Sequence, residues 1–359
     1  MSATGFFRTG TAALMMVLLS ACATPTMVYV SNAESQDISV FRLDTAQGTL
    51  QPVQTRAVGG TVMPMAVSAD RQRLYAAIRS KPYSVVALRI DNRDGTLHEL
   101  GAAPLADSMA NIALDRGNKL ILSASYGGNK LSVNPLDKDG VPQAPSQIVP
   151  TGPMAHQVSS SPDGRFVYAS VLGADQLIRL DVDAATGRLQ GEPVVALQLP
   201  AQSGPRHFVF STRHALIYLL DELDGRLHVL RHDAATGGAS LLQTVSVVPP
   251  GFSGKPAAAD LHLTPDGRFL YASERGSNTL AGFEVAAADG QLRLIDHWPT
   301  ETQPRGFNIS PDGRFLLAVG QKSHSLTSYR IDAATGRLTE VARVPTGKGP
   351  NWVEIVPLR

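Results

Sequence analysis

Polar residues recur at two fixed distances from a short apolar segment that repeats along the chain. One set follows the third residue of the segment by four positions and comprises Arg79, Tyr126, Leu172, Glu222, Arg275 and Gln321. A second set precedes it by twelve positions and comprises His156, Arg206 and Arg305. Several arginines together indicate an anionic ligand, because the planar guanidinium group matches carboxylate and phosphate geometry. Glu222 or His156 could supply a general acid or base.

Any one of these residues alone is better explained by an ion pair in a solvated channel, and only their convergence favours a site. His207 is expected to face a neighbouring layer of strands. Asp260 and His262 alternate in a strand, but two ligands make a poor metal site, so a structural hydrogen bond is expected. Five further residues are expected to be exposed to solvent: Lys322, His324, His98, His228 and His232. No nucleophile elbow, P-loop, dinucleotide fingerprint or Cys/His metal spacing occurs, which predicts chemistry without a metal or cofactor.

The apolar segment that sets these distances occurs seven times. Its third residues lie 46 to 53 positions apart and are Tyr29, Tyr75, Leu122, Tyr168, Tyr218, Tyr271 and Leu317. Turn residues recur in register with it, as at 183–187 and 332–336. A strand-rich, helix-poor repeat of this length is typical of the blades of a β-propeller.

The last complete repeat predicts how one blade is built. Residues 304–309, 314–319, 326–331 and 338–344 have the pattern of four short strands joined by turns. The first repeat lacks its first strand, and residues 350–356 match the first strands of other repeats. The C-terminus is therefore expected to complete the first blade and close the ring, which removes two open sheet edges. The sequence predicts an all-β fold: one seven-bladed propeller of four-stranded antiparallel blades over residues 27–359.

Propeller geometry assigns each loop to one of two faces. The turns between strands one and two, and between strands three and four, share a face and are nearly interchangeable in sequence, so they need only turn chemistry. The loops between strands two and three share the other face with the links between blades. Both polar sets fall on this second face, where they should surround the mouth of the central channel. Function is expected where the repeats diverge.

The first 22 residues differ from the rest of the chain. Residues 11–19 form an apolar run that is too short to span a bilayer, and it ends in Leu-Ser-Ala-Cys. This pattern is typical of a secretory signal with a bacterial lipobox, in which Cys22 is lipidated. Residues 23–26 would be a short tether, and the propeller would be anchored at the cell envelope, facing the periplasm. If residues 1–22 are not a signal, the protein is cytoplasmic.

The composition of the chain limits the kinds of molecule that it is expected to bind. The chain has 32 basic and 31 acidic residues with no basic run, which argues against nucleic-acid binding. Its single cysteine excludes an intrachain disulfide. A closed ring leaves no sheet edge that requires a partner, so a monomer is expected, with membrane contact only through the lipid anchor.

Several segments together resemble a known family. They are residues 204–210 (GPRHFVF), 258–268 (AADLHLTPDGR), 300–308 (TETQPRGFN), 320–324 (GQKSH) and 347–353 (GKGPNWV). The resemblance, from about residue 27 to the C-terminus, is to the seven-bladed lactonase family, which includes a propeller-type bacterial 6-phosphogluconolactonase and a fungal carboxy-cis,cis-muconate cyclase. It is closest to the phosphogluconolactonase branch in the later blades and looser over residues 101–200.

The resemblance implies metal-free hydrolysis of a small anionic sugar lactone, 6-phosphogluconolactone or a related aldonolactone. In the cyclase branch a histidine, two arginines and a glutamate form the proposed active site, and the matching positions here are His156, Arg206, Glu222 and Arg275. Arg305, Gln321, Arg79 and Tyr126 are then expected to bind substrate. Two alternatives remain open: a muconate-type lactonising cycloisomerase and a non-catalytic binding propeller. An export signal would favour an unphosphorylated aldonolactone or another acidic lactone, because the phosphorylated substrate is made in the cytoplasm.

Overall fold

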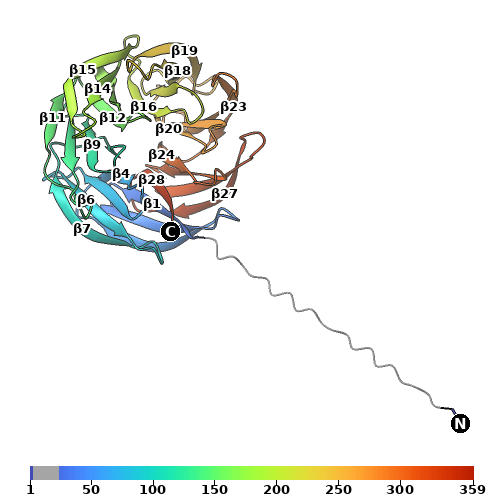
Figure 1. Ribbon diagram of the computed structural model, residues 1–359. Helices are drawn as coiled ribbons and strands as arrows, with labels where there is room; N and C mark the ends of the chain where they lie inside the picture. Colours follow the sequence, from blue (N-terminus) through green and yellow to red (C-terminus); the bar gives the residue numbers. More distant parts are fainter. Residues whose placement is uncertain (3–23) are drawn as a thin grey trace.

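Seven four-stranded antiparallel sheets form a closed ring in the computed structural model (Figure 1). The structure describes residues 1–2 and 24–359. The first blade contains β28 (Pro350–Pro357), β1 (Thr26–Asn32), β2 (Asp37–Leu43) and β3 (Leu50–Ala57). The second contains β4 (Val62–Val67), β5 (Arg73–Ile78), β6 (Ser84–Ile90) and β7 (Leu97–Pro104). The third contains β8 (Asn111–Leu114), β9 (Leu120–Ser125), β10 (Lys130–Pro135) and β11 (Gln147–Pro150).

The remaining four blades repeat the same order. The fourth contains β12 (Ala155–Ser160), β13 (Phe166–Val171), β14 (Gln176–Val182) and β15 (Leu189–Gln198). The fifth contains β16 (Pro205–Phe210), β17 (Leu216–Asp221), β18 (Arg226–His232) and β19 (Ala239–Ser246). The sixth contains β20 (Ala258–Leu263), β21 (Phe269–Glu274), β22 (Thr279–Val285) and β23 (Leu292–Pro299). The seventh contains β24 (Pro304–Ile309), β25 (Phe315–Gly320), β26 (Ser325–Ile331) and β27 (Leu338–Pro345).

The predicted fold and ring closure are confirmed. β28 pairs antiparallel with β1, with Val28 opposite Ile355 and Val30 opposite Val353. In the described part of the chain, the only helical element is a short 3₁₀ turn, Leu172–Ala174. Among those residues, no helix is long and apolar enough to cross a membrane. The predicted signal, with Cys22, lies outside the described residues.

The core is divided into seven apolar clusters, one between each pair of neighbouring blades. Alternate side chains of a strand enter the two adjacent clusters: Tyr29 packs toward the second blade, whereas Val28 and Val30 pack toward the seventh. This alternation follows from the two-residue period of a strand. It also explains why the second strands are apolar on both faces.

The recurring tyrosine and the recurring turn glycine bond to each other across blades. Five tyrosine hydroxyls donate to the glycine carbonyl in the last turn of the next blade at 2.6–2.9 Å, in the pairs Tyr29–Gly95, Tyr75–Gly140, Tyr168–Gly237, Tyr218–Gly290 and Tyr271–Gly336. The glycines have positive φ, near +70° to +80°. These turns were predicted to need only turn chemistry. That prediction was incomplete, because they also join the blades.

Replacing Tyr218 with phenylalanine is expected to lower the free energy of unfolding by about 1–2 kcal/mol, because the buried Gly290 carbonyl loses its donor. Denaturant unfolding measures the loss. The matched control is Tyr83→Phe, at a partly exposed tyrosine in the loop before β6. Equal losses in the two variants would contradict a specific role for the bond between blades.

Candidate active site

The predicted residues at the start of the inner strands occupy β-bulges. In β12 the pairing register shifts between Ala155 and Gln157, which leaves His156 as the extra residue. The same shift places Arg206 in the bulge of β16 and Arg305 in the bulge of β24. A bulge re-aims one side chain and leaves its backbone outside the ladder. The repeated bulge therefore presents His156, Arg206 and Arg305 on the same face of the ring.

Three of the predicted residues come together in a direct ion-pair cluster. Arg206 Nε lies 2.8 Å from Glu222 Oε2, and Arg275 Nη2 lies 3.0 Å from Glu222 Oε1. Arg206 Nη1 also donates to the carbonyl of Ala259, and Arg275 Nε donates to that of Ala257 at 2.9 Å. Arg206 is buried, whereas Glu222 and Arg275 remain partly open, with 23% and 15% of their side chains exposed. The cluster is therefore accessible to solvent.

The arginines keep Glu222 ionised. Burial alone would raise the pKa of this carboxyl group, but Arg206 and Arg275 outweigh burial and hold the pKa below its usual value. Burial and the like charge of Arg275 lower the pKa of Arg206 to about 10, which leaves the guanidinium protonated at neutral pH. A carboxylate held by two cations is a weak proton acceptor. Glu222 thus fixes the two guanidinium groups in place.

His156 lies beside this cluster as a buried neutral imidazole. Its ring packs edge-on against Tyr126, with centroids 6.1 Å apart, and against His207 at 5.2 Å. Its Nδ1 atom is buried and has no hydrogen-bond partner among the described residues. Burial, and then the positive charges of Arg206 and Arg305, hold the pKa of His156 well below 6.5. A neutral imidazole with a free nitrogen can accept a proton from a substrate or water.

Two further arginines have no acidic partner. In residues 24–359 no carboxylate lies within ion-pair distance of Arg79 or Arg305, although Arg79 Nε donates to Ser108 Oγ at 2.7 Å. Burial and repulsion by Arg206 and Arg275 hold the pKa of Arg305 well below its ordinary value. Arg206, Arg275 and Glu222 together already carry a net positive charge, and the further positive charge of Arg79 and Arg305 beside them attracts an anion.

Tyr126 and Gln321, the other predicted substrate-binding residues, make no side-chain hydrogen bond or ion pair with the charged cluster among the described residues. Tyr126 is 36% exposed and contacts the group only through the edge of His156. The backbone amide of Gln321 donates to the Gln303 carbonyl at 3.1 Å. Leu172, at the equivalent position in the fourth blade, is buried in the 3₁₀ turn.

Comparison with known proteins gives a consistent result. Residues 22–355 match the family "Lactonase, 7-bladed beta-propeller". The 6-phosphogluconolactonases of Pectobacterium carotovorum and Serratia proteamaculans are each 39% identical over 283 residues, covering 79% of this chain and 84% of theirs. The periplasmic gluconolactonase of Pseudomonas aeruginosa superposes with a TM-score of 0.86 at 28% identity, covering 94% of this chain and all of its own.

The chain belongs to the seven-bladed β-propeller lactonase family. It is an enzyme of the lactonase class, which sets aside the non-catalytic alternative.

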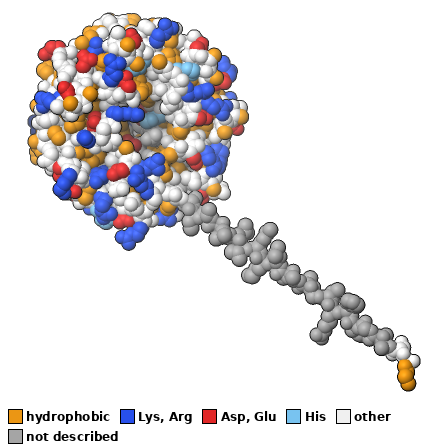
Figure 2. Space-filling view, viewed as in Figure 1, with side chains coloured by type: hydrophobic (Ala, Val, Ile, Leu, Met, Phe, Trp, Pro, Cys, Tyr) orange, Lys and Arg blue, Asp and Glu red, His pale blue; other side chains and the backbone are white. Residues whose placement is uncertain are grey.

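Figure 2 shows a central hollow in the ring, with Lys or Arg and His side chains around it.

The channel of this lactonase also contains a polar group of His207, Asp260 and His262, which the sequence analysis did not assign to the site. His207 was expected to face the neighbouring blade, and it does so by pairing with Asp260 of β20; it also adjoins the central cavity, with its ring 5.9 Å from that of Trp352. Its Nδ1 pairs with Asp260 Oδ1 at 2.8 Å, and His262 Nε2 lies 3.3 Å from Asp260 Oδ2. The expected structural hydrogen bond between Asp260 and His262 is thereby confirmed. A cavity of about 100 Å³ adjoins these side chains.

Two histidine predictions were wrong. His228 and His232, expected to be solvated, are 3% and 7% exposed. His228 bridges Asp221 at 2.7 Å and Thr244 at 2.9 Å, and His232 Nε2 meets the Tyr168 hydroxyl at 2.9 Å. Each is buried because a polar partner in the same blade or the neighbouring one satisfies it. Sequence alternation alone could not reveal those partners.

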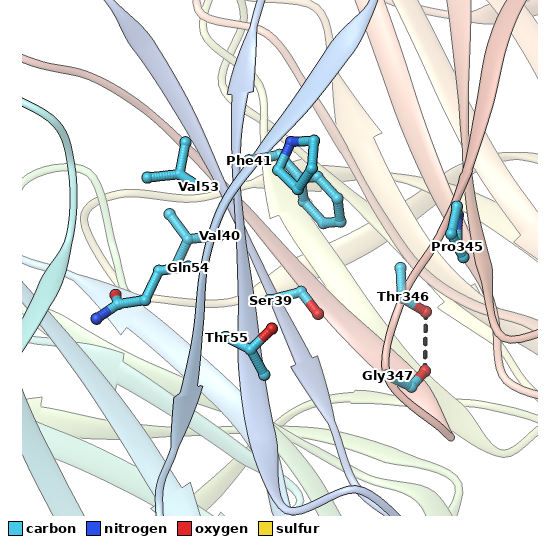
Figure 3. Close-up of a pocket in the computed structure, with 10 residues that line it drawn as sticks. Ser39, Val40, Phe41, Val53, Gln54, Thr55, Pro345, Thr346 and Gly347 are labelled. Atoms are coloured by element: carbon cyan, nitrogen blue, oxygen red, sulfur yellow. Dashed lines mark hydrogen bonds between the residues drawn. The ribbon is translucent and has the colours of Figure 1, made fainter.

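A larger hollow lies away from the charged cluster. It has a volume of about 400 Å³ between β2, β3 and the link after β27, and it is lined by neutral residues that include Phe41, Gln54 and Thr346 (Figure 3). Without a titratable or charged side chain in this lining, the hollow offers no acid, base or anion-binding group. The charged cluster at the channel mouth is the better candidate for chemistry.

Proposed function

We propose that this lactonase hydrolyses a sugar lactone that carries an anionic group, with 6-phosphogluconolactone or a related aldonolactone as substrate. The observation that supports the proposal is the charge of Arg79 and Arg305, which have no acidic partner in residues 24–359, beside an Arg206–Glu222–Arg275 cluster that itself carries a net positive charge. A phosphate or carboxylate would relieve the repulsion among these arginines. The names of the 6-phosphogluconolactonase and gluconolactonase relatives favour a sugar lactone as substrate, and the former name favours the phosphorylated one.

In the proposed mechanism the arginines polarise the lactone carbonyl. Arg206 or Arg275 donates to the carbonyl oxygen and stabilises the oxyanion as a water oxygen bonds to the carbonyl carbon. His156 takes one proton from that water and passes it to the ring oxygen when the ring C–O bond breaks. The product hydroxy acid then ionises and releases one proton to solvent.

His156 fits the role of base better than Glu222. Glu222 is occupied by two guanidinium groups, and its pKa lies below the usual value. His156 is neutral with a free nitrogen, and an anionic substrate would offset the arginine charges that hold its pKa down. The negative charge of the oxyanion would also offset the arginine charges and raise the pKa of His156 as the reaction proceeds.

An assay of three lactones tests the function directly. Purified protein is incubated with 6-phosphogluconolactone, gluconolactone and muconolactone, and each rate is corrected for spontaneous hydrolysis. Faster opening of the phosphorylated lactone supports an anion-binding site. Preference for gluconolactone would exclude a role for the anionic group, and action on muconolactone alone would indicate the cycloisomerase activity.

Replacing Arg305 with alanine is expected to raise KM for the anionic lactone by about tenfold or more and to change kcat less, because a charge-assisted contact to substrate is lost. Steady-state kinetics on phosphorylated and unphosphorylated lactones measure the effect. The matched control is Arg314→Ala, an exposed arginine in the turn before β25 whose Nη1 donates to the Thr45 carbonyl. An equal rise in KM for both lactones would contradict a role for Arg305 in anion recognition.

We propose further that Cys22 is lipidated and anchors the enzyme at the cell envelope, facing the periplasm. The support is the apolar run followed by Leu-Ser-Ala-Cys, and the name of the Pseudomonas relative agrees with that location. Cys22→Ala is expected to move the protein from the membrane fraction to the soluble fraction, as judged by fractionation and immunoblotting. Recovery of the uncleaved wild type in the cytoplasm would contradict the anchor.

A further inference from the structure

A single buried carboxylate joins three neighbouring inner strands. Asp260 lies in β20 and is 7% exposed. Its Oδ1 pairs with His207 Nδ1 of β16 at 2.8 Å and accepts from the Leu261 amide at 2.9 Å. Its Oδ2 accepts from the Phe307 amide of β24 at 3.1 Å and pairs with His262 at 3.3 Å. The Asp260 carboxylate therefore links its own strand, β20, to the neighbouring strands β16 and β24.

Two of the three joined strands, β16 and β24, carry an arginine of the site at the bulge. His207 directly follows Arg206, and Phe307 lies two residues after Arg305. The bulges interrupt the backbone ladder at these arginines, so the sheet alone does not fix their position. Asp260 accepts hydrogen bonds immediately beside both bulges, from His207 in β16 and from the Phe307 amide in β24. It also lies in the bulge of β20, next to Ala259, whose carbonyl accepts from the Arg206 guanidinium.

The charge state of Asp260 suits this role. Burial disfavours the ionised form, but His262 and the hydrogen bond from His207 outweigh burial and hold the pKa of Asp260 well below its usual value. An ionised acceptor makes shorter and stronger hydrogen bonds than a neutral one. Other ionisable groups near the pair are His156 in β12, Arg206 in β16 and Glu354 in β28.

We propose that Asp260 is a positioning residue for the arginine cluster, fixing Arg206 through His207 and Arg305 through the Phe307 amide. It thereby sets the distance between the guanidinium that polarises the lactone carbonyl and the one that binds the anionic group. The inference rests on the proposed function. A displacement of about 1 Å in a positioned group can reduce a rate by about a hundredfold, so a residue that touches no substrate can control turnover.

Three variants of the full-length protein separate the hydrogen bond from general packing. His207→Phe keeps a ring but loses the bond to Asp260, and kcat is expected to fall by about 10² with KM within about threefold. His207→Asn keeps an N–H near the Nδ1 position and should recover most of the loss. The matched control is His232→Phe, a buried histidine at the far end of the same blade, which should leave kcat unchanged.

Asp260→Asn tests both connections at once. An amide can accept with only one of its two polar atoms, so kcat should fall and KM for the anionic lactone should rise together. Circular dichroism establishes that each variant is folded at the assay temperature, and if Asp260→Asn does not fold, His207→Phe carries the test. Wild-type kinetics in folded His207→Phe, or the same loss in His232→Phe, would overturn the proposal.

A crystal structure of His207→Phe gives a readout that does not depend on the substrate. The Arg206–Glu222 contact, 2.8 Å in the wild type, is expected to break or to lengthen by about 1 Å. An unmoved cluster would overturn the positioning role. Failure of the wild type on every lactone, with a displaced cluster in the variant, would instead reject the proposed function and retain the positioning.

Discussion

Replacing His156 with asparagine is expected to lower kcat on the preferred lactone by about 10² to 10⁴, the usual contribution of a positioned general base. His156 is buried, has a free Nδ1 and lies within the field of three arginines. Asparagine keeps a polar side chain of similar length but cannot accept a proton at neutral pH. Steady-state kinetics with background hydrolysis subtracted measure the loss.

The pH dependence of the wild type gives a second test of His156. A general base works in its deprotonated form, so kcat/KM falls as the pH drops through its pKa. Because the pKa of His156 is held well below 6.5, the acid limb should lie below pH 6.5. The free energy of unfolding should fall over the same pH range. The unfolded chain binds a proton at His156 more readily than the folded protein does, so His156 does not oppose folding above pH 6.5. As the pH drops below 6.5 toward the lower pKa of the folded protein, that stability is progressively lost. Rates must therefore be compared where the protein remains folded.

Glu222→Gln is the informative comparison for the base. It should also slow turnover, because Arg206 and Arg275 lose the carboxylate that aligns them. It should leave the acid limb in place, whereas His156→Asn should remove it. The opposite pattern, with near-normal turnover in His156→Asn and no acid limb in Glu222→Gln, would identify Glu222 as the base.

Repeat register was enough to predict the fold and to place Arg206, Glu222 and Arg275 near one another. Arg206, Glu222 and Arg275 come from two blades, yet equivalent positions in a closed ring must lie on the same face. Residues at the same offset from the repeated segment therefore occupy equivalent positions in successive blades. This works because every blade repeats one hydrogen-bonded geometry around a common axis.

Details that depend on irregular backbone or on specific partners could not be read from the repeat. The bulges that aim His156, Arg206 and Arg305 insert one residue without a distinct sequence signature. The burial of His228 depends on Asp221 and Thr244, which lie on different strands of its sheet. For the same reason the ion pairs of Glu222 with both arginines could not be predicted from the repeat and are known only from the distances.

Deleting residues 351–359 is expected to prevent stable folding. β28 is the inner strand of the first blade, and its loss would expose β1 and open the ring. The deleted segment includes four buried apolar side chains, Val353, Ile355, Val356 and Leu358. Truncating one large buried side chain costs about 2–5 kcal/mol, and a typical domain is stable by only about 5–15 kcal/mol. Thermal melting by circular dichroism, with recovery from the soluble fraction, measures the effect.

Hydrogen bonds of Asn351 add to that loss and make the ring closure specific. Its Nδ2 donates to the Ser31 carbonyl at 3.1 Å and to the Val62 carbonyl at 3.3 Å, so one side chain ties the closing strand to the first and second blades. Removing Arg359 alone, an exposed terminal residue, is the matched control and should leave the melting temperature unchanged. A 351–359 deletion that melts like the full chain would mean that six complete blades and a three-stranded remnant are stable without closure. In that case the seven clusters between blades, rather than the pairing of β28 with β1, would determine stability.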